Sequence, residues 1–233
     1  MAALALLLGA CGAPQPKQLP RPPPPIAVPA TAPPATAPPA TAAQERYRID
    51  GAHSELRVLV YRAGIMAALG HNHVIVNRSL GGWVTAGGPP SGAAFALTVP
   101  AADFVVDPST ARREEGADFS EVVADDAKAG TARNMLGPAV LAAADHPIIT
   151  VRSVAISETG GTLEATVAIE VAGHESRLAV PFTLERAPRR LTAHGSLALR
   201  QTALGLTPFS IMLGALRVED QMALKFTLVA RRD

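Results

Sequence analysis

Apolar and polar residues alternate with a period of two in one segment after another from Tyr47 to the end of the chain. In LEATVAIEV, residues 163–171, every odd position is apolar, while two of the even positions are glutamates. The stretches RLAVPFTLE (177–185) and QMALKFTLVAR (221–231) repeat the pattern. Such alternation is typical of antiparallel strands with one dry face and one solvated face. The folded part of the chain is therefore predicted to be all-β.

About eight strands are predicted, near residues 47–63, 71–86, 91–105, 147–158, 161–173, 175–186, 189–202 and 213–231. Residues 118–144 break the alternation and are predicted to be loop and helix, with Thr131 as a helix cap and Pro138 at the first position of a second helix. One insertion among eight strands fits a closed barrel better than a sandwich, because closure removes the exposed edges. The predicted fold is an extended, lipocalin-like antiparallel barrel with a helical insertion after the third strand.

The interior of an eight-stranded barrel is wide enough to be filled by side chains or to hold one small ligand. Aromatic residues make up only 4% of this chain, so the apolar interior is expected to be sparsely filled. Two alternatives stay open: a cavity that accepts an elongated apolar guest, and a barrel filled by its own side chains. The side chains predicted to face inward are Val58, Val60, Leu97, Val99, Val167, Ile169, Val180, Phe182, Leu224 and Phe226.

The N-terminus reads MAALALLLGAC, an apolar run that is too short to span a bilayer and fits the apolar region of a secretory signal. LGAC resembles a bacterial lipobox, so residues 1–11 are predicted to be a lipoprotein signal peptide with Cys11 as the lipidated residue. Residues 12–46 are rich in Pro, Ala and Thr and are predicted to be a disordered linker before the barrel domain, residues 47–233. The expected location is the periplasm. Gly12, by resemblance to enteric lipoproteins, favours anchoring in the outer membrane.

The net charge of +1, from 21 basic and 20 acidic side chains, argues against a nucleic-acid-binding protein. The single cysteine excludes an intrachain disulfide framework and a cysteine-rich zinc site. Two charge clusters in the region of the insertion, REE at 113–115 and DD at 125–126, are predicted to lie on a solvated face. Ser54 follows His53, but the chain has no Gly-x-Ser-x-Gly elbow, so no catalytic residue is predicted.

Three stretches, YRIDGAHSELRVLVYRAG, DHPIITVRSVAI and LRQTALGLTPFS, resemble the YceI-like family of lipid- and polyisoprenoid-binding barrels. The matching residues are Tyr47, Ile49, Asp50, His53 and Ser54 in the first stretch, Pro147, Ile149 and Ser153 in the second, and Leu204, Gly205 and Leu206 in the third. The resemblance covers about residues 47–230. It implies an extended antiparallel barrel whose cavity binds long isoprenoid chains, such as quinones or polyprenyl lipids.

The stretch LGHNH, residues 69–73, lies outside the family's common pattern and marks a subgroup. Its two histidines would share one face of a strand, a spacing that is used in zinc sites, but no third ligand follows at a diagnostic distance. Three interpretations stay open: a structural turn with hydrogen-bonded histidines, a polar contact with a ligand head group, and a metal site. The residues predicted at a head group or cavity mouth are Arg62, His71, His73, Arg133 and Asn134.

The sequence thus predicts a non-enzymatic, membrane-tethered periplasmic carrier or binding protein for a long isoprenoid lipid of the quinone or polyprenyl type. One alternative is a metal-binding protein or metal-dependent enzyme centred on His71 and His73, and another is an interaction scaffold with a filled barrel. No cofactor is expected other than a bound isoprenoid lipid or quinone. The expected partners are an apolar lipid and the membrane. The oligomeric state stays open, with a homodimer as one alternative.

Overall fold

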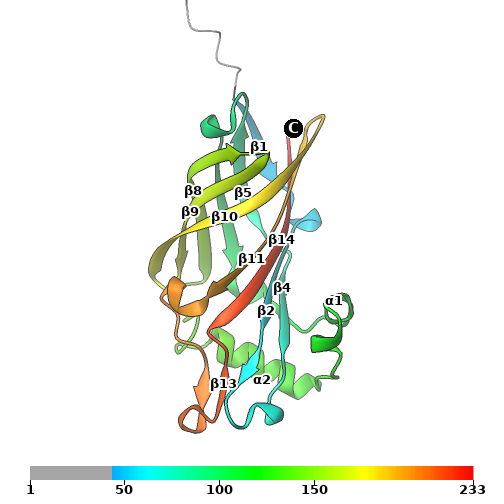
Figure 1. Ribbon diagram of the computed structural model, residues 1–233, viewed down its shortest axis with the longest axis vertical. Helices are drawn as coiled ribbons and strands as arrows, with labels where there is room; N and C mark the ends of the chain where they lie inside the picture. Colours follow the sequence, from blue (N-terminus) through cyan, green and yellow to red (C-terminus); the bar gives the residue numbers. More distant parts are fainter. Residues whose placement is uncertain (1–43, 233) are drawn as a thin grey trace, which may run out of the picture. The chain divides into compact units, whose positions relative to one another are not determined.

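The computed structural model describes residues 44–232, and within them eight antiparallel strands form a closed ring (Figure 1). Around the ring the strands are β1 (Glu45–Ile49), β5 (Gly81–Ala86), β6 (Ala94–Pro100), β8 (Ile148–Thr159), β9 (Thr162–Val171), β10 (His174–Ala187), β11 (Arg190–Arg200) and β14 (Gln221–Arg231). Arg48 and Ile49 of β1 pair with Arg231 and Ala230 of β14 and close the ring. The predicted eight-stranded antiparallel barrel is confirmed. Cys11, the predicted signal peptide and the linker up to residue 43 lie outside the described residues.

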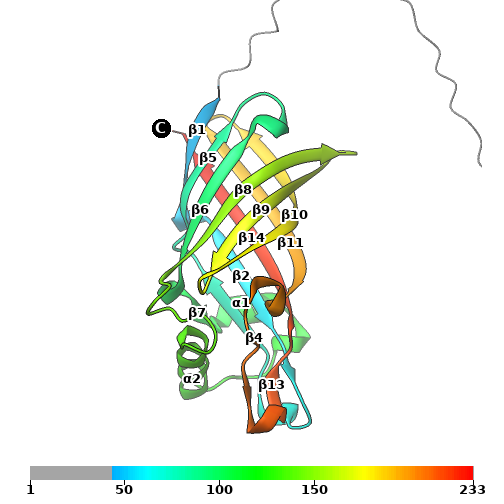
Figure 2. The same cartoon turned by 90° about the vertical axis from the view of Figure 1, so that its left-hand side faces the viewer.

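The first three predicted strands are each interrupted. β1 is followed by β2 (Glu55–Val60), β5 is preceded by β4 (His73–Asn77), and β6 is followed by β7 (Val105–Val106). β2, β4 and β7 pair with one another in that order, and β2 also pairs with residues 223–227 of β14. The sheet therefore continues below the closed ring as a partly open wall (Figure 2).

A serine bridges the break between β1 and β2. The Ser54 hydroxyl donates to the Asp50 carbonyl at 2.8 Å and accepts the Val229 N–H at 2.9 Å, while the Asp50 N–H donates to the Val229 carbonyl at 2.8 Å. The side chain therefore completes the ladder with β14 where the 3-10 turn Gly51–His53 interrupts the strand. This arrangement gives a structural reason for Ser54 of the family-like opening, while the Asp50 carboxylate bonds to His53 and Arg231.

A β-bulge on β8 between Ser153 and Ala155 keeps the apolar residues of this strand facing inward. Ile149 and Val151 line the interior before the bulge and Ile156 after it, so the inward phase shifts by one residue. The Ser153 hydroxyl accepts the Phe95 N–H at 2.9 Å beside the bulge. The bulged residue, Val154, is left on the outer surface and is 44% exposed.

The insertion after β7 contains two helices, α1 (Ser109–Glu114) and α2 (Asp125–Leu136). The insertion is confirmed, but its internal boundaries were predicted wrongly. Thr131 lies in the middle of α2 rather than at a cap, and Pro138 follows the end of that helix rather than beginning another. α2 instead begins with two aspartates, which interact favourably with the positive end of the helix dipole. Within residues 44–232, no helix is long and apolar enough to span a membrane.

The prediction that the REE cluster is solvated is wrong for Glu115. Its side chain is only 4% exposed and accepts hydrogen bonds from Arg57 at 2.8 Å and Lys225 at 2.5 Å. Burial raises the pKa of the Glu115 carboxyl, but these two bonds outweigh the effect of burial and hold the pKa below its ordinary value. The cluster thus attaches the end of α1 to the outer face of β2 and β14.

A small second sheet forms the lower end of the barrel domain, opposite the end where β1 begins (Figures 1 and 2). It contains β12 (Ser210–Ile211), β13 (Leu216–Val218) and β3 (Arg62–Ala63), in that order. Two 3-10 turns, Ala67–Leu69 and Met212–Gly214, belong to the same region. Two segments far apart in the sequence therefore meet at this end.

Candidate functional site

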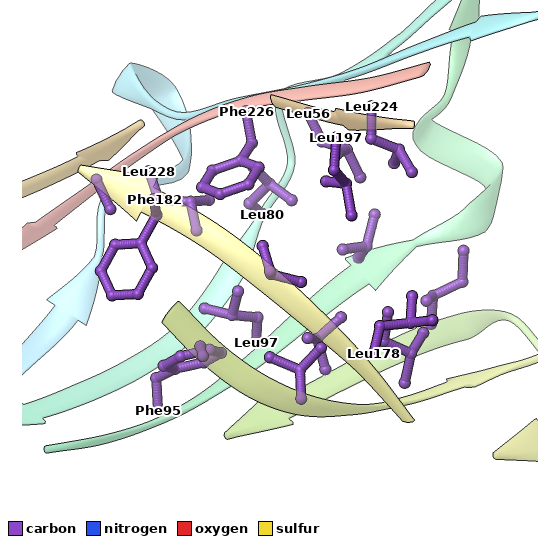
Figure 3. Close-up of a pocket in the computed structure, with 18 of the residues that line it drawn as sticks. Leu56, Leu80, Phe95, Leu97, Leu178, Phe182, Leu197, Leu224, Phe226 and Leu228 are labelled. Atoms are coloured by element: carbon purple, nitrogen blue, oxygen red, sulfur yellow. The ribbon is translucent and has the colours of Figure 1, made fainter. Parts of the chain in front are cut away.

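The strands of the barrel enclose an elongated cavity of about 320 Å³. Among the described residues that line it, only Arg186 and Gln201 have polar side chains. Figure 3 shows side chains from opposite walls, including Phe95, Phe182 and Phe226, projecting into the same space. The interior is therefore an apolar chamber that is only partly filled by its own side chains.

All ten side chains predicted to face inward line this cavity. Their period-two pattern places them there because successive side chains of a strand point to opposite faces. Along β14 the lining residues are Met222, Leu224, Phe226, Leu228 and Ala230. The eight steps from the first to the last of these span about 27 Å at about 3.4 Å per residue. Contact between these side chains and a lipid stays a prediction.

Small residues on β11 leave room in the cavity. Gly195 lies beneath the ring of Phe226, and a Cβ atom at this glycine would come within 2.2 Å of the Phe226 Cζ atom. Ala193 also lines the cavity and is paired with Leu184 on one side and Leu228 on the other. A larger side chain at Ala193 would extend into the chamber from between two leucines.

The two ends of the cavity differ in chemistry. At the upper end Arg186 lines both the cavity and an adjoining hollow, to which Glu158 and Thr183 also contribute. At the lower end Gln201 is buried, and its side-chain amide donates to the Glu219 carbonyl at 2.6 Å. The upper end is thus the one where a charged side chain meets the apolar interior.

The sequence analysis missed Arg186, although a signal for it existed. On β10 the inward phase runs through Leu178, Val180, Phe182 and Leu184, and Arg186 is the next residue in that phase. A charged residue at the end of a strand, in the next inward-facing position after a run of inward-facing apolar residues, indicates a cavity mouth.

The five residues predicted at a mouth do not line the cavity. Arg133 and Asn134 are exposed on α2. Arg62 donates to the Gly70 carbonyl and forms an ion pair with Glu121 at 3.1 Å. His73 pairs with Val60 of β2 and follows the phase of Ile75, so it lies on the cavity-side face of the wall, where its ring meets α2 rather than the cavity. His71 lies beside Glu121 of the insertion. Contact of either histidine with a head group stays a prediction.

Asn72 of the LGHNH stretch connects three segments. Its side-chain oxygen accepts the Arg62 N–H at 3.0 Å, its side-chain amide donates to the Asp118 carbonyl at 3.0 Å, and its own carbonyl accepts from Arg112 at 2.7 Å. His71 beside it is partly exposed and lies 3.7 Å from a Glu121 carboxylate oxygen. The stretch therefore joins β3, the start of β4 and the helical insertion.

His73 belongs to a buried charged network. Its Nδ1 atom lies 2.6 Å from Asp107 Oδ2, and Asp107 Oδ1 accepts from Arg112 at 2.6 Å and from the Val74 N–H at 2.9 Å. The Asp107 side chain is 0% exposed. Burial raises the pKa of this carboxyl, but the hydrogen bonds outweigh burial, so the pKa lies below its ordinary value and the group is charged at neutral pH.

The other ring nitrogen of His73, Nε2, lies 3.3 Å from the Thr131 hydroxyl of α2. Carboxylate, imidazole and hydroxyl thus follow one another in the order of a hydrolase triad. Here, however, Arg112 also binds the carboxylate, and the hydroxyl belongs to a helix that the network attaches to the barrel. We therefore assign the network a structural role, which agrees with the structural interpretation of LGHNH. His73 bonds to side chains rather than to backbone, and His71 lies 3.7 Å from the Glu121 carboxylate.

The metal interpretation finds no support in this geometry. The ring centroids of His71 and His73 are 6.1 Å apart, and both nitrogens of His73 already have partners. Within residues 44–232, no group of three His, Cys, Asp or Glu side chains is placed to hold a metal ion. A structural zinc site in a protein normally has four ligands, and a catalytic one has at least three from the protein.

Solved structures of other proteins have the same fold. BcnA from Burkholderia cenocepacia matches with a TM-score of 0.57 and 18% identity, over 78% of this chain and 98% of BcnA. A polyisoprenoid-binding domain from Saccharophagus degradans, implicated in plant cell wall breakdown, matches with a TM-score of 0.52 and 11% identity, over 80% and 98% of the two chains. A Campylobacter jejuni YceI protein matches with a TM-score of 0.42 and 9% identity, over 60% of this chain and 72% of that one.

No protein-family model and no curated protein sequence matches the chain. The likeness to solved structures is one of fold. BcnA and the Saccharophagus degradans domain are matched over nearly their whole length, so the barrel is a known architecture. The fold implied by the YceI-like resemblance is thereby confirmed.

Proposed function

We propose that the barrel binds a long apolar lipid of the isoprenoid type in its cavity and acts as a carrier rather than an enzyme. The observation that carries this proposal is the cavity wall, which is apolar except at Arg186 and Gln201 among the described residues. Burial of apolar ligand surface contributes about 25 cal/mol per Å² before the costs of ordering are subtracted. An elongated hydrocarbon gains most from such a wall because it has few polar groups to desolvate.

The cavity volume limits how much of a ligand fits without rearrangement. A cavity of about 150 Å³ holds one benzene molecule. The observed cavity of about 320 Å³ therefore has room for a chain of roughly a dozen carbon atoms. A longer isoprenoid requires the inward side chains to rearrange or the chain to extend out of a mouth.

We place the head group at the upper mouth, beside Arg186. The guanidinium group carries five N–H donors and no acceptor, so it suits the carbonyl oxygens of a quinone or the oxygens of a polyprenyl phosphate. Glu158 and Thr183 in the adjoining hollow provide acceptors for a hydroxyl group. This placement replaces the mouth that was predicted around His71 and His73.

The comparison with other proteins agrees with a lipid ligand. The Saccharophagus degradans protein is described as a polyisoprenoid-binding domain, and it shares the fold at 11% identity. The shared fold supports the class of ligand, while the cavity wall of this chain supports its apolar character.

For location, we propose that Cys11 is lipidated and tethers the barrel to a membrane facing the periplasm, with the outer membrane as the favoured site. Cys11→Ser should then release the protein into the soluble periplasmic fraction. Wild-type protein with an unmodified Cys11 peptide in that fraction would contradict the tether. This result would leave the cavity proposal unaffected.

The cavity proposal is tested by mass spectrometry of organic extracts of the purified full chain, with Ala193→Phe as the blocking variant. A phenyl ring at this position would occupy roughly half of the cavity, since about 150 Å³ holds one benzene. The control is Ala198→Phe, because Ala198 is exposed on the outer face of the same strand.

We expect an isoprenoid lipid in extracts of the wild type and of Ala198→Phe, and a reduced amount in Ala193→Phe. Both variants should keep the circular dichroism spectrum of a β-protein. Equal amounts of lipid in the two variants, or none in the wild type produced in a host that makes quinones and polyprenyl lipids, would contradict the proposal.

A further inference from the structure

The lower end of the barrel domain exposes a group of large apolar side chains, which we call the apolar tip. Its members are Ile65, Leu69, Ile211, Met212 and Leu213, with exposed fractions of 95%, 66%, 42%, 62% and 109%. Scattered exposed apolar residues are ordinary, but a contiguous group often marks an interaction surface.

The two segments that carry the tip, residues 61–72 and 207–218, are held against each other. β3 pairs with β13, and the Met66 N–H donates to the Ala215 carbonyl at 2.8 Å. Gly64, with φ of +96°, approaches this segment so closely that a Cβ atom would lie 2.4 Å from the Ala215 carbonyl oxygen. Both views show the two hairpins side by side at the same end (Figures 1 and 2). The tip is therefore one surface.

The backbone of the tip is strained at the residues that protrude most. Met212 and Leu213 have φ values of +52° and +55°, which place two consecutive apolar residues in the left-handed region. Glycine and asparagine occupy this region far more readily than leucine does. Folding alone gives no reason for bulky apolar residues here, because the Leu213 side chain is fully exposed to solvent. Strain of this kind is commonly retained at functional positions.

The two tip segments carry basic but no acidic side chains, and exposed Glu219 directly follows the second segment. Segments 61–72 and 207–218 contain Arg62, His71 and Arg217 and no Asp or Glu. Arg62 is paired with Glu121 from outside these segments, whereas no carboxylate within residues 44–232 forms an ion pair with the exposed Arg217. A protruding apolar surface beside unpaired basic charge suits an anionic bilayer, whose interface attracts both features.

The position of the tip relates it to the cavity. Val60 and Leu206 line the cavity, and the chain runs from each of them directly into one of the two tip segments. Gln44, where the described chain begins, bonds to Gly92 at the opposite, upper end. The tip thus lies at the end of the barrel opposite the one where the described chain begins, and close to the lower end of the cavity.

We infer that the apolar tip inserts into the interface of a lipid bilayer, with Leu213 and Met212 entering the acyl chains and Arg217 remaining among anionic head groups. A second copy of this chain is a less suitable occupant, since the same basic, protruding surface would have to face itself. Insertion would bring the lower end of the cavity next to membrane lipid.

The test uses the full chain with Cys11→Ser, so that an introduced cysteine is the only thiol and no lipid is attached to Cys11. An environment-sensitive fluorophore is placed on Leu213→Cys and, as a matched control, on Val154→Cys of the barrel wall. The probe is vesicles of phosphatidylethanolamine and phosphatidylglycerol, with phosphatidylcholine vesicles for comparison. We expect a blue shift with the anionic vesicles for the label at 213 and none for the label at 154.

A second pair of variants separates insertion from folding. Met212→Asn with Leu213→Asn should weaken vesicle partitioning at least about tenfold, because burial of a single leucine is worth more than that factor. Asparagine tolerates the left-handed region, so the melting temperature should stay the same or rise. The same pair of Asn substitutions in a chain with Arg217→Gln should abolish the preference for anionic vesicles.

Two results would overturn the inference. One is an unshifted label at 213 in both kinds of vesicle, and the other is a shift that appears without vesicles and grows with protein concentration, which would assign the tip to self-association. Neither measurement needs a ligand in the cavity. Failure here would therefore leave the proposed lipid cavity untouched, and failure of the cavity test would leave the tip untouched.

Discussion

Arg112 offers the sharpest test of how the helical insertion is held to the barrel. Its side chain is 8% exposed and donates to Asp107 Oδ1 at 2.6 Å, to the Asn72 carbonyl at 2.7 Å and to the Glu121 carbonyl at 2.8 Å. Arg112→Met keeps most of the side-chain volume but removes the charge. The Asp107 carboxylate would then remain buried without its cationic partner.

Removal of one partner from a buried ion pair costs about 3–5 kcal/mol. For a domain of this size, each kcal/mol lowers the melting temperature by roughly 2–4 °C. Arg112→Met should therefore lower the melting temperature by about 6–20 °C. Arg113→Met is the matched control, since this neighbouring side chain is exposed and bonds only to Thr110 in the described chain, so its loss should cost less than about 0.5 kcal/mol.

Thermal unfolding followed by circular dichroism measures both variants, and amide hydrogen exchange locates the effect. Exchange should accelerate first across α1 and α2, because Arg112 joins α1 to the start of β4 and to the loop before α2. A double variant with Asp107→Asn should recover part of the loss, since the uncompensated charge is then gone. Equal melting temperatures for Arg112→Met and Arg113→Met would refute the assignment of this network as the attachment of the insertion.

Three further predictions concern stability. Acidification from about pH 5 to pH 3 should destabilise the wild type more than Glu115→Gln. The pKa of the Glu115 carboxyl is lower in the folded than in the unfolded chain, so the carboxylate stabilises the fold at a pH above its ordinary pKa, and this stability is lost as the pH falls through the pKa of the folded state. Melting curves against pH measure this. Ser54→Ala should cost about 1–3 kcal/mol in urea unfolding, since it leaves the buried Val229 N–H without its acceptor, and a cost below 0.5 kcal/mol would contradict the bridging role. His73→Ala should lower the melting temperature while His71→Ala should not, with retained lipid unchanged in both; loss of lipid at an unchanged melting temperature would restore the head-group hypothesis.

The barrel wall was predictable because its residues obey one simple rule. Val167 and Ile169, or Leu224 and Phe226, keep their inward phase over a whole uninterrupted strand, so alternation in the sequence translates directly into the cavity lining. The rule does not depend on which strands are neighbours. For this reason the cavity-lining residues could be named without knowledge of the strand order.

The strand breaks left a signal that the strand predictions did not use. The cavity-lining positions change from odd to even between Ile49 and Leu56, and again between Ile75 and Leu80. Because side chains alternate strictly along a strand, a change of phase requires a break or a bulge. An unbroken strand over residues 47–63 or 71–86 was therefore incompatible with its own apolar pattern.

The charged network was beyond the reach of pattern analysis. His73 and Asp107 are 34 residues apart and meet only because the two-residue strand β7 pairs with β4. A strand this short has no recognisable period. Asp107 adopts a left-handed backbone with φ of +55°, which directs its carboxylate back toward β4, and nothing local in the sequence specifies this direction.

The closure of the ring by β1 and β14 affects how the chain must be synthesised and folded. Arg48 pairs with Arg231, far along the chain, so the barrel cannot close until β14 is available. Contacts of such high sequence separation fold slowly, and until they form, β1 and β11 present unpaired strand edges that invite aggregation. A nascent chain would therefore need protection from aggregation until β14 emerges, and loss of β14 would leave an open sheet rather than a smaller barrel.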